Sequence, residues 1–177
     1  MLNQGPRISA TAITVSPSPG LLPSLLIDYR SCGVGSPTTA DLVTSRISHT
    51  SVDCRDAYAL SVWWAETLGM AEDPRDPNEP GHAECIIFSP DGRTRVLFIQ
   101  VPEDKQVKNR LHFDLRPTSG SREAEVAWLL DRGALQLADR RRPDGTGWVT
   151  LADPEGNKFC VLRGDEEAPD QYAHLVR

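Results

Sequence analysis

Two histidines with matching surroundings are the residues of this sequence best suited to chemistry. His49 lies near the start of an alternating segment, residues 47–53, and His112 lies in the corresponding place in a second one, residues 110–116. Such alternation predicts that both segments are β-strands. Arg110 precedes His112 by two residues and therefore shares its strand face. There its guanidinium suits either a bound carboxylate or phosphate, or a salt bridge with an acidic neighbour.

A helical pattern follows each of these strands. The first runs over residues 56–68, with Asp56 as its N-cap and Gly69 as its stop, and the second runs over about 119–132. Trp64 belongs to the apolar stripe of the first helix. Because the adjacent Trp63 points in another direction, we expect it to line a ligand pocket or a subunit interface. The residues expected to face the core are Ala57, Leu60, Trp64 and Leu68 in the first helix and Val126, Leu129 and Leu130 in the second.

The two strand-helix segments open a repeat. Four pairs of residues recur at an offset of 64 positions, namely Trp64 and Trp128, Gly69 and Gly133, Pro90 and Pro154, and Gly92 and Gly156. Short strand patterns follow each helix, at about 82–89 and 94–101 in the first half and 134–140, 146–152 and 157–163 in the second. A further strand, poorly marked in the sequence, is expected at about 70–76. The turns at 89–92 and 153–156 have hairpin chemistry, and we expect the acidic residues of the second turn, Asp153 and Glu155, to face solvent. Each half is thus predicted to be β-α-β-β-β.

The repeat and its motifs resemble the vicinal oxygen chelate superfamily, which includes glyoxalase I, bleomycin-resistance proteins and extradiol dioxygenases. The matching runs are His49-Thr-Ser-Val-Asp-Cys54, Trp63-Trp64-Ala-Glu-Thr-Leu-Gly69, Asn109-Arg-Leu-His112-Phe-Asp-Leu115, Gly145-Thr-Gly-Trp148 and Leu151-Ala-Asp-Pro-Glu-Gly-Asn157-Lys-Phe-Cys-Val161. The resemblance is closest to the glyoxalase-like branch. It implies an α+β domain over residues 46–163, in which two tandem β-α-β-β-β modules (about 46–103 and 109–163) form a curved mixed sheet that encloses a cup-shaped cavity.

The resemblance also implies where a metal would bind. Metal-dependent members of the superfamily place one histidine on the first strand of each module, which matches His49 and His112, and a glutamate on the last strand. This sequence has Cys160 at the glutamate position. Three interpretations stay open: no metal site, a His₂Cys site for a divalent metal such as zinc, nickel or iron, or a site completed by another residue such as Gln100 or Glu84.

Composition limits the remaining possibilities. Lysine and arginine number 19 against 25 acidic residues, so the net charge of −6 argues against a nucleic-acid partner. No stretch approaches the roughly 18 apolar residues of a membrane span. The four cysteines have no zinc-ribbon spacing, and we expect reduced thiols and a cytoplasmic location. Residues 1–45, in which Pro, Gly, Ser and Thr supply 21 positions, are predicted to be a disordered extension, and 164–177 a C-terminal tail.

The function expected from these observations is binding of a small metabolite or drug in the cup, as bleomycin-resistance proteins do. The substrate-binding residues would be Trp63, Arg110 and Trp148, the last as a stacking surface for a planar ligand. The alternative is a metal-dependent lyase or isomerase of the glyoxalase type, or less readily a dioxygenase, that uses His49, His112 and a third ligand. We also expect a homodimer, because pairing would cover open sheet edges.

Overall fold

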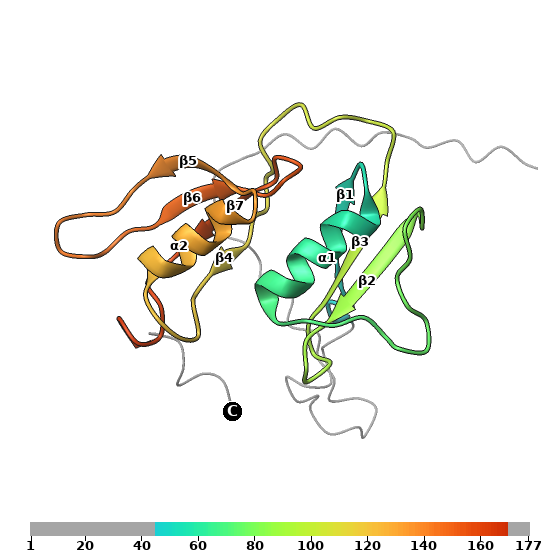
Figure 1. Ribbon diagram of the computed structural model, residues 1–177, viewed down its shortest axis with the longest axis horizontal. Coiled ribbons are helices and arrows are strands. Elements are labelled where there is room, and N and C mark those ends of the chain that lie inside the picture. The colour runs from blue at the N-terminus through green and yellow to red at the C-terminus, as the bar shows by residue number, and fades with distance from the viewer. Residues whose placement is uncertain (1–44, 170–177) are drawn as a thin grey trace, which may run out of the picture. The chain divides into compact units, whose positions relative to one another are not determined.

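The alternating and helical segments fold into two β-sheets and two α-helices. The computed structural model describes residues 45–169, of which those from Ile47 belong to one compact unit, and Figure 1 shows the elements that they form. The elements are β1 (Thr50–Cys54), α1 (Ala57–Leu68), β2 (Glu84–Phe88), β3 (Arg95–Gln100), β4 (Asp114–Leu115), α2 (Arg122–Asp131), β5 (Leu135–Asp139), β6 (Val149–Ala152) and β7 (Lys158–Val161). The predicted mixed α+β class is confirmed.

The first sheet contains three strands in the order β1-β3-β2, with β1 parallel and β2 antiparallel to β3. The strand expected at residues 70–76 is reduced to two isolated bridges, Ala71 with Phe88 and Asp73 with Asp76. Pro74 and Pro77 explain this, because proline has no backbone N–H to donate to a strand ladder. The first half is therefore β-α-β-β in the described residues.

The second sheet contains four strands in the order β4-β7-β6-β5, with β4 parallel to β7 and the other pairs antiparallel. Together with α2, these strands follow the order β-α-β-β-β. Val149, Leu151, Phe159 and Val161 point to one side of β6 and β7 and are at most 1% exposed. That side is the core face, so the alternate residues of the same strands form the opposite, open face.

The ends of α1 lie where its sequence predicts, and α2 begins slightly later than its sequence predicts. Asp56 caps α1 by accepting a hydrogen bond from the Ala59 N–H, and Gly69 ends it in the left-handed region at φ 60°. Ser121 caps α2 in the same way, and this helix begins at Arg122, three residues after its predicted start. Leu130, which was expected to face the core, is 38% exposed.

Trp63 and Trp64 are both buried, which corrects the expectation that only Trp64 faces the core. Their exposed fractions are 7% and 2%, and their rings meet edge to face at 5.0 Å. Both rings also contact Phe159 of the second sheet, at centroid distances of 5.9 and 5.2 Å. Since α1 packs against the first sheet and also against the second, two adjacent positions on this helix can be buried at once.

The turn at residues 153–156 joins the two halves. Asp153 is 1% exposed, and its carboxylate accepts hydrogen bonds from the Trp64 indole N–H (3.1 Å) and the Asn157 backbone N–H (2.8 Å). Glu155 accepts from the backbone N–H groups of Arg55 (2.6 Å) and Asp56 (2.9 Å) at the start of α1. The expectation that these two acids face solvent was therefore wrong. Their partners lie about 90–100 residues earlier in the chain, so the turn by itself gave no sign of them.

The predicted N-terminal extension, residues 1–45, lies outside the described residues except for its last residue. The first part of the predicted C-terminal tail contacts the second half, because Glu167 accepts hydrogen bonds from the backbone N–H groups of Arg122 and Gly164. Within residues 45–169, neither helix is long and apolar enough to cross a membrane.

Candidate functional site

The open face of the second sheet gathers the polar residues of β4, β7 and β6 into one row. Asp114 lies opposite Cys160 in the parallel pairing of β4 and β7, and Cys160 lies opposite Thr150 in the antiparallel pairing of β7 and β6. Directly paired residues point to the same side of a sheet. His112, two residues before Asp114, points to that side as well.

His112, Asp114 and Cys160 bring three possible metal ligands together. One donor atom from each lies within 4.8 Å of the other two, and His112 Nε2 is 3.5 Å from Asp114 Oδ1. His112 and Asp114 are exposed, whereas Cys160 is 7% exposed. The cluster is thus accessible from solvent on its imidazole and carboxylate side, with the thiol at its base.

The thiol of Cys160 is poorly suited to lose its proton. Burial raises the pKa of this thiol, and the negative charge of Asp114 raises it further, while a hydrogen bond with Thr150 (Oγ1 to Sγ, 3.8 Å) opposes both effects. Metal ligation by cysteine requires the thiolate. The carboxylate of Asp114 is therefore the readier anionic donor, and the set fits a divalent ion through His112 and Asp114 better than through the thiol.

A cavity of about 800 Å³ extends from this cluster over the open face. Trp148 and Leu137, which are 40% and 46% exposed, supply apolar surface in it. The cavity also exposes cationic side chains to whatever occupies it. Its complete lining is Lys108, His112, Asp114, Leu137, Ala138, Arg140, Trp148, Thr150, Lys158, Cys160 and Leu162.

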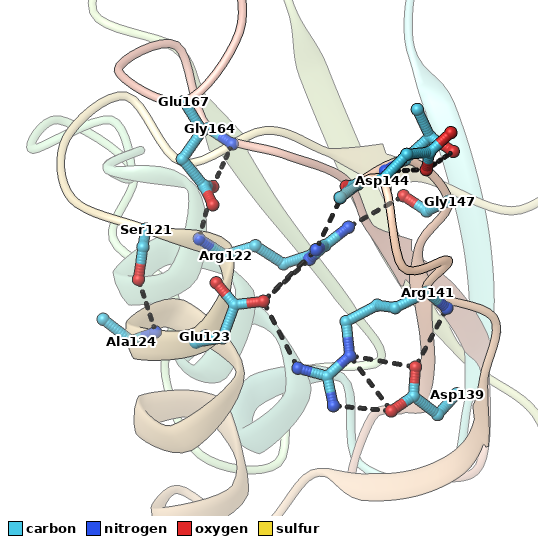
Figure 2. A network of polar contacts seen from close by, with 12 residues as sticks. Ser121, Arg122, Glu123, Ala124, Asp139, Arg141, Asp144, Gly147, Gly164 and Glu167 are labelled. Atoms are coloured by element: carbon cyan, nitrogen blue, oxygen red, sulfur yellow. Dashed lines mark hydrogen bonds and ion pairs between the residues drawn. The ribbon is translucent and has the colours of Figure 1, made fainter.

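The loop that precedes Trp148 is held by a buried arginine (Figure 2). Arg122 is 3% exposed and donates hydrogen bonds to the carbonyl oxygens of Gly147 (3.0 Å) and Gly145 (3.4 Å). The backbone N–H of Arg140 donates to the Trp148 carbonyl at 2.9 Å, which completes the hairpin. Trp148 is thereby held at the rim of the cavity by contacts that reach from α2.

Charge pairing separates two consecutive arginines at this loop. Arg141 forms ion pairs with Asp139 (2.5 Å) and Glu123 (3.3 Å), as Figure 2 shows, and these contacts hold its guanidinium between β5 and α2. Arg140 lines the cavity instead. Arg140 is therefore available to a ligand and Arg141 is not.

The structure places the other predicted site residues apart from the cluster. His49 is exposed just before β1, on the side of the first sheet shared with Ser51, and its Nδ1 lies 3.2 Å from Ser48 Oγ. Arg110 lines a different cavity, of about 580 Å³, which also includes His112.

Trp63, expected to bind substrate, lies in the core and donates its indole N–H to the Arg132 carbonyl at 3.0 Å. Glu84 and Gln100, the alternative third ligands, lie at the ends of β2 and β3 in the first sheet. Neither belongs to the sheet that carries His112 and Cys160.

Asp114 is the site residue that sequence reasoning missed. The signal was present, because Asp114 follows His112 by two residues on a segment already assigned as a strand. Only the parallel register of β4 and β7 shows that its carboxylate stands opposite Cys160.

Comparison with known proteins places this geometry in a family. The sequence model described as Glyoxalase-like domain matches residues 49–162. No curated protein matches the sequence.

Among solved structures, the fosfomycin resistance protein FosX from Mesorhizobium loti is 14% identical, with a TM-score of 0.51, and covers 76% of this chain and 100% of its own. A mutant FosX from Listeria monocytogenes, in complex with Mn(II) and 1S,2S-dihydroxypropylphosphonic acid, is 15% identical with the same TM-score and the same coverage. A possible glyoxalase from Bacillus cereus is 17% identical, with a TM-score of 0.48, and covers 66% of this chain and 97% of its own. At these identities the two FosX structures share the fold of this chain.

Proposed function

The chain belongs to the glyoxalase-like domain family, within the vicinal oxygen chelate superfamily, and on that premise we propose that it binds a small molecule on the open face of β4–β7. The observation that carries the proposal is the cavity of about 800 Å³ with a polar cluster at its base. Small-molecule sites in proteins occupy about 300–1,000 Å³ and combine apolar walls with a few convergent polar groups. Trp148 and Leu137 supply the apolar surface, and His112, Asp114 and Cys160 supply the polar groups.

Filling this cavity tests the proposal. Ala138 is half-buried on β5 and lines the cavity, so Ala138→Trp places a large side chain inside it. Ala127→Trp adds the same bulk on the exposed surface of α2 and is the matched control. We expect ligands found by saturation-transfer NMR, in a screen of small oxygenated metabolites, to bind wild type and the control but not Ala138→Trp. Ligands that bind all three proteins equally would show that this cavity is not the site.

A metal-dependent lyase or isomerase is the second candidate function, and the cluster of His112, Asp114 and Cys160 favours it. A divalent ion held by the imidazole and the carboxylate would act as a Lewis acid toward a substrate oxygen. The Mn(II) in the FosX complex belongs to that protein and supports this reading only as a precedent for the fold. A zinc, nickel or iron ion fits the same donor set.

Metal content separates the two candidates. Because burial raises the pKa of the Cys160 thiol, we expect the purified protein to carry well under one equivalent of divalent metal. Cys160→Glu supplies the carboxylate that metal-dependent relatives have and should raise the affinity for a divalent ion, whereas Cys160→Ser should not. Stoichiometric metal in the wild type that is lost in Asp114→Asn would favour the enzyme with the ion on the imidazole and the carboxylate, and its loss in Cys160→Ser would favour a thiolate-ligated one.

We further propose that the chain forms a homodimer in which the open faces wall a shared cup, with His49 of one copy near His112 of the other. Support comes from the position of His49 outside the cluster and from the apolar side chains left exposed on the second sheet, Leu135 (63%), Leu137 (46%) and Trp148 (40%).

Mixing His49→Ala with His112→Ala tests this arrangement. A shared site restores metal or ligand binding in the mixed dimer, because one of its two sites keeps both histidines. Binding that is absent in every mixture would place both histidines in the site of one chain, and undiminished binding by His49→Ala alone would show that His49 is not part of the site.

A further inference from the structure

We propose that the cavity on the open face of β4–β7 selects ligands that carry an oxyanion, a carboxylate or a phosphate, on a flat apolar body. This inference rests on the proposed small-molecule function and adds the chemical class of the ligand. It is drawn from the charges and apolar surfaces that line the cavity.

The cavity is cationic although the whole chain is acidic. Its lining contains three cationic side chains, Lys108, Arg140 and Lys158, against one carboxylate, that of Asp114. The chain carries a net charge of −6. The concentration of positive charge in the cavity is therefore a local feature, and such a feature attracts anions.

The three cationic side chains are also free to bind a ligand. Within the described part of the chain, none of them forms an ion pair. Most of the other arginines in residues 45–169 form an ion pair, for example Arg116 with Asp165 at 3.0 Å and Arg141 with Asp139 at 2.5 Å. The one carboxylate of the cavity, Asp114, lies 3.5 Å from His112 and is partly engaged there. An oxyanion in the cavity thus meets cations without a competing partner.

The cations and the apolar surface occupy different ends of the cavity. Continuing the register of β4 and β7 by two residues places His112 opposite Lys158. Lys108 lies near the same end, because it also lines the neighbouring cavity that includes Asn157, the residue before Lys158. Toward the other end, Trp148 lies just beyond the pair of Val149 and Val161, close to Leu162.

The separation of the two ends sets the size of the ligand. Lys158 and Leu162 are four residues apart on one extended segment, which corresponds to about 13 Å. Lys158 and Arg140 start from opposite ends of the cavity, because Arg140 pairs with Trp148 at the far end. We therefore assign the oxyanion to Lys108 and Lys158 beside His112, and the flat body to Trp148 and Leu137. Arg140 then lies beside the flat body, where a guanidinium can stack or contact a second polar group.

Binding of defined aromatic probes tests this assignment. The probes are 2-naphthoate, 2-naphthyl phosphate and the neutral ester methyl 2-naphthoate, titrated calorimetrically into the full chain treated with EDTA, so that metal plays no part. We expect naphthoate or the phosphate to bind at least about fivefold more tightly than the ester, since hydrogen bonds to charged groups are the stronger ones. The probe that binds more tightly identifies a carboxylate or a phosphate as the preferred oxyanion.

Substitutions then locate the charge. The side chain of Lys158 has no hydrogen-bond partner within residues 45–169, so Lys158→Gln removes a charge without breaking a contact there, and Lys108→Gln is a second such variant on the exposed connection between the halves. Each should weaken the anionic probe about fivefold and leave the ester within twofold. Arg142→Gln makes the same change in charge on the 140–147 loop, outside the cavity lining, and should leave both probes within twofold. Trp148→Ala should weaken anionic and neutral probes by the same factor.

Equal affinity for naphthoate and its ester, or equal effects of Lys158→Gln and Arg142→Gln, would overturn the proposal. So would the failure of all three probes to bind. These results are distinct from failure of the proposed function, because neutral ligands displaced by Ala138→Trp would still establish a small-molecule site on this face.

Discussion

Removing the carboxylate of Glu155 is expected to destabilise the domain by about 2 kcal/mol. Glu155 accepts hydrogen bonds from the backbone N–H groups of Arg55 at 2.6 Å and Asp56 at 2.9 Å, at the positive end of α1. Charge-assisted hydrogen bonds contribute about 1.5 kcal/mol or more each when buried, and less here, where water can partly replace the lost acceptor. A negative charge at a helix N-terminus adds about 0.3–1 kcal/mol. Glu155→Gln keeps one acceptor oxygen and should cost about half as much as Glu155→Ala.

The turn at residues 89–92 supplies the matched control. Asp91 occupies the position 64 residues before Glu155, but its carboxylate bonds only within its own turn, to Ser89 Oγ (2.6 Å) and the Arg93 N–H (3.0 Å). Asp91→Ala should therefore cost less than half of what Glu155→Ala costs. Urea unfolding followed by tryptophan fluorescence measures both. A loss of 2 kcal/mol lowers the midpoint by about 1 M at a typical slope of about 2 kcal/mol/M. Equal shifts for Glu155→Ala and Asp91→Ala would refute the reasoning that the contact between the halves carries the difference.

Three further predictions concern the buried polar groups and the hairpin loop. Gly147→Ala should prevent normal folding of the loop or lower the free energy of unfolding by more than about 2 kcal/mol in a urea titration, because Gly147 has φ 89° and a Cβ there would lie 2.1 Å from the Arg140 carbonyl oxygen. The control is Gly145→Ala, whose Cβ meets no atom within 4 Å, so that only the strain of a positive φ destabilises it. Arg122→Met should cost about 2–3 kcal/mol by thermal or urea unfolding, since it leaves the carbonyls of Gly147 and Gly145 without their donor. Burial raises the pKa of the Asp153 carboxyl above its usual 3.8 in the folded state, despite its N–H donors. The stabilisation that comes from protonating this carboxyl is therefore fully present below pH 3.8 and is lost as the pH rises through the folded-state pKa. The difference in stability between wild type and Asp153→Asn should shrink from pH 3.5 to pH 7, and a difference that grows would contradict this.

The parts of the fold that sequence reasoning predicted are those decided by local chemistry. The N-cap of α1 at Asp56 and its stop at Gly69 depend on residues within one helical turn, and the structure confirms both. The strand at 70–76 was expected from the repeat alone, and Pro74 in that segment limits it to isolated bridges. Patterns decided by neighbours in sequence were therefore readable, and those inferred only by analogy between the halves were not.

The misassigned residues are those whose environment comes from distant parts of the chain. Trp63 is buried because α1 contacts two sheets, which no periodicity within the helix encodes. Leu130 belongs to the apolar pattern of α2 that was expected to face the core, but it is 38% exposed. At the candidate site, the strand of His112 could be predicted, but the register that sets Asp114 beside Cys160 could not.

The two look-alike turns of this domain should respond in opposite ways to engineering. A short epitope inserted after Asp91 lengthens a hairpin whose contacts are local, and loop insertions of this kind carry a small entropic cost. The same epitope inserted after Glu155 separates Asp153 and Glu155, which bind the Trp64 indole and the α1 N–H groups, from Asn157, whose backbone N–H donates to Asp153. A turn with such contacts is not an exchangeable end of one half of the domain. It is the position at which each half depends on the other, and it would be among the last segments of the chain to accept length variation.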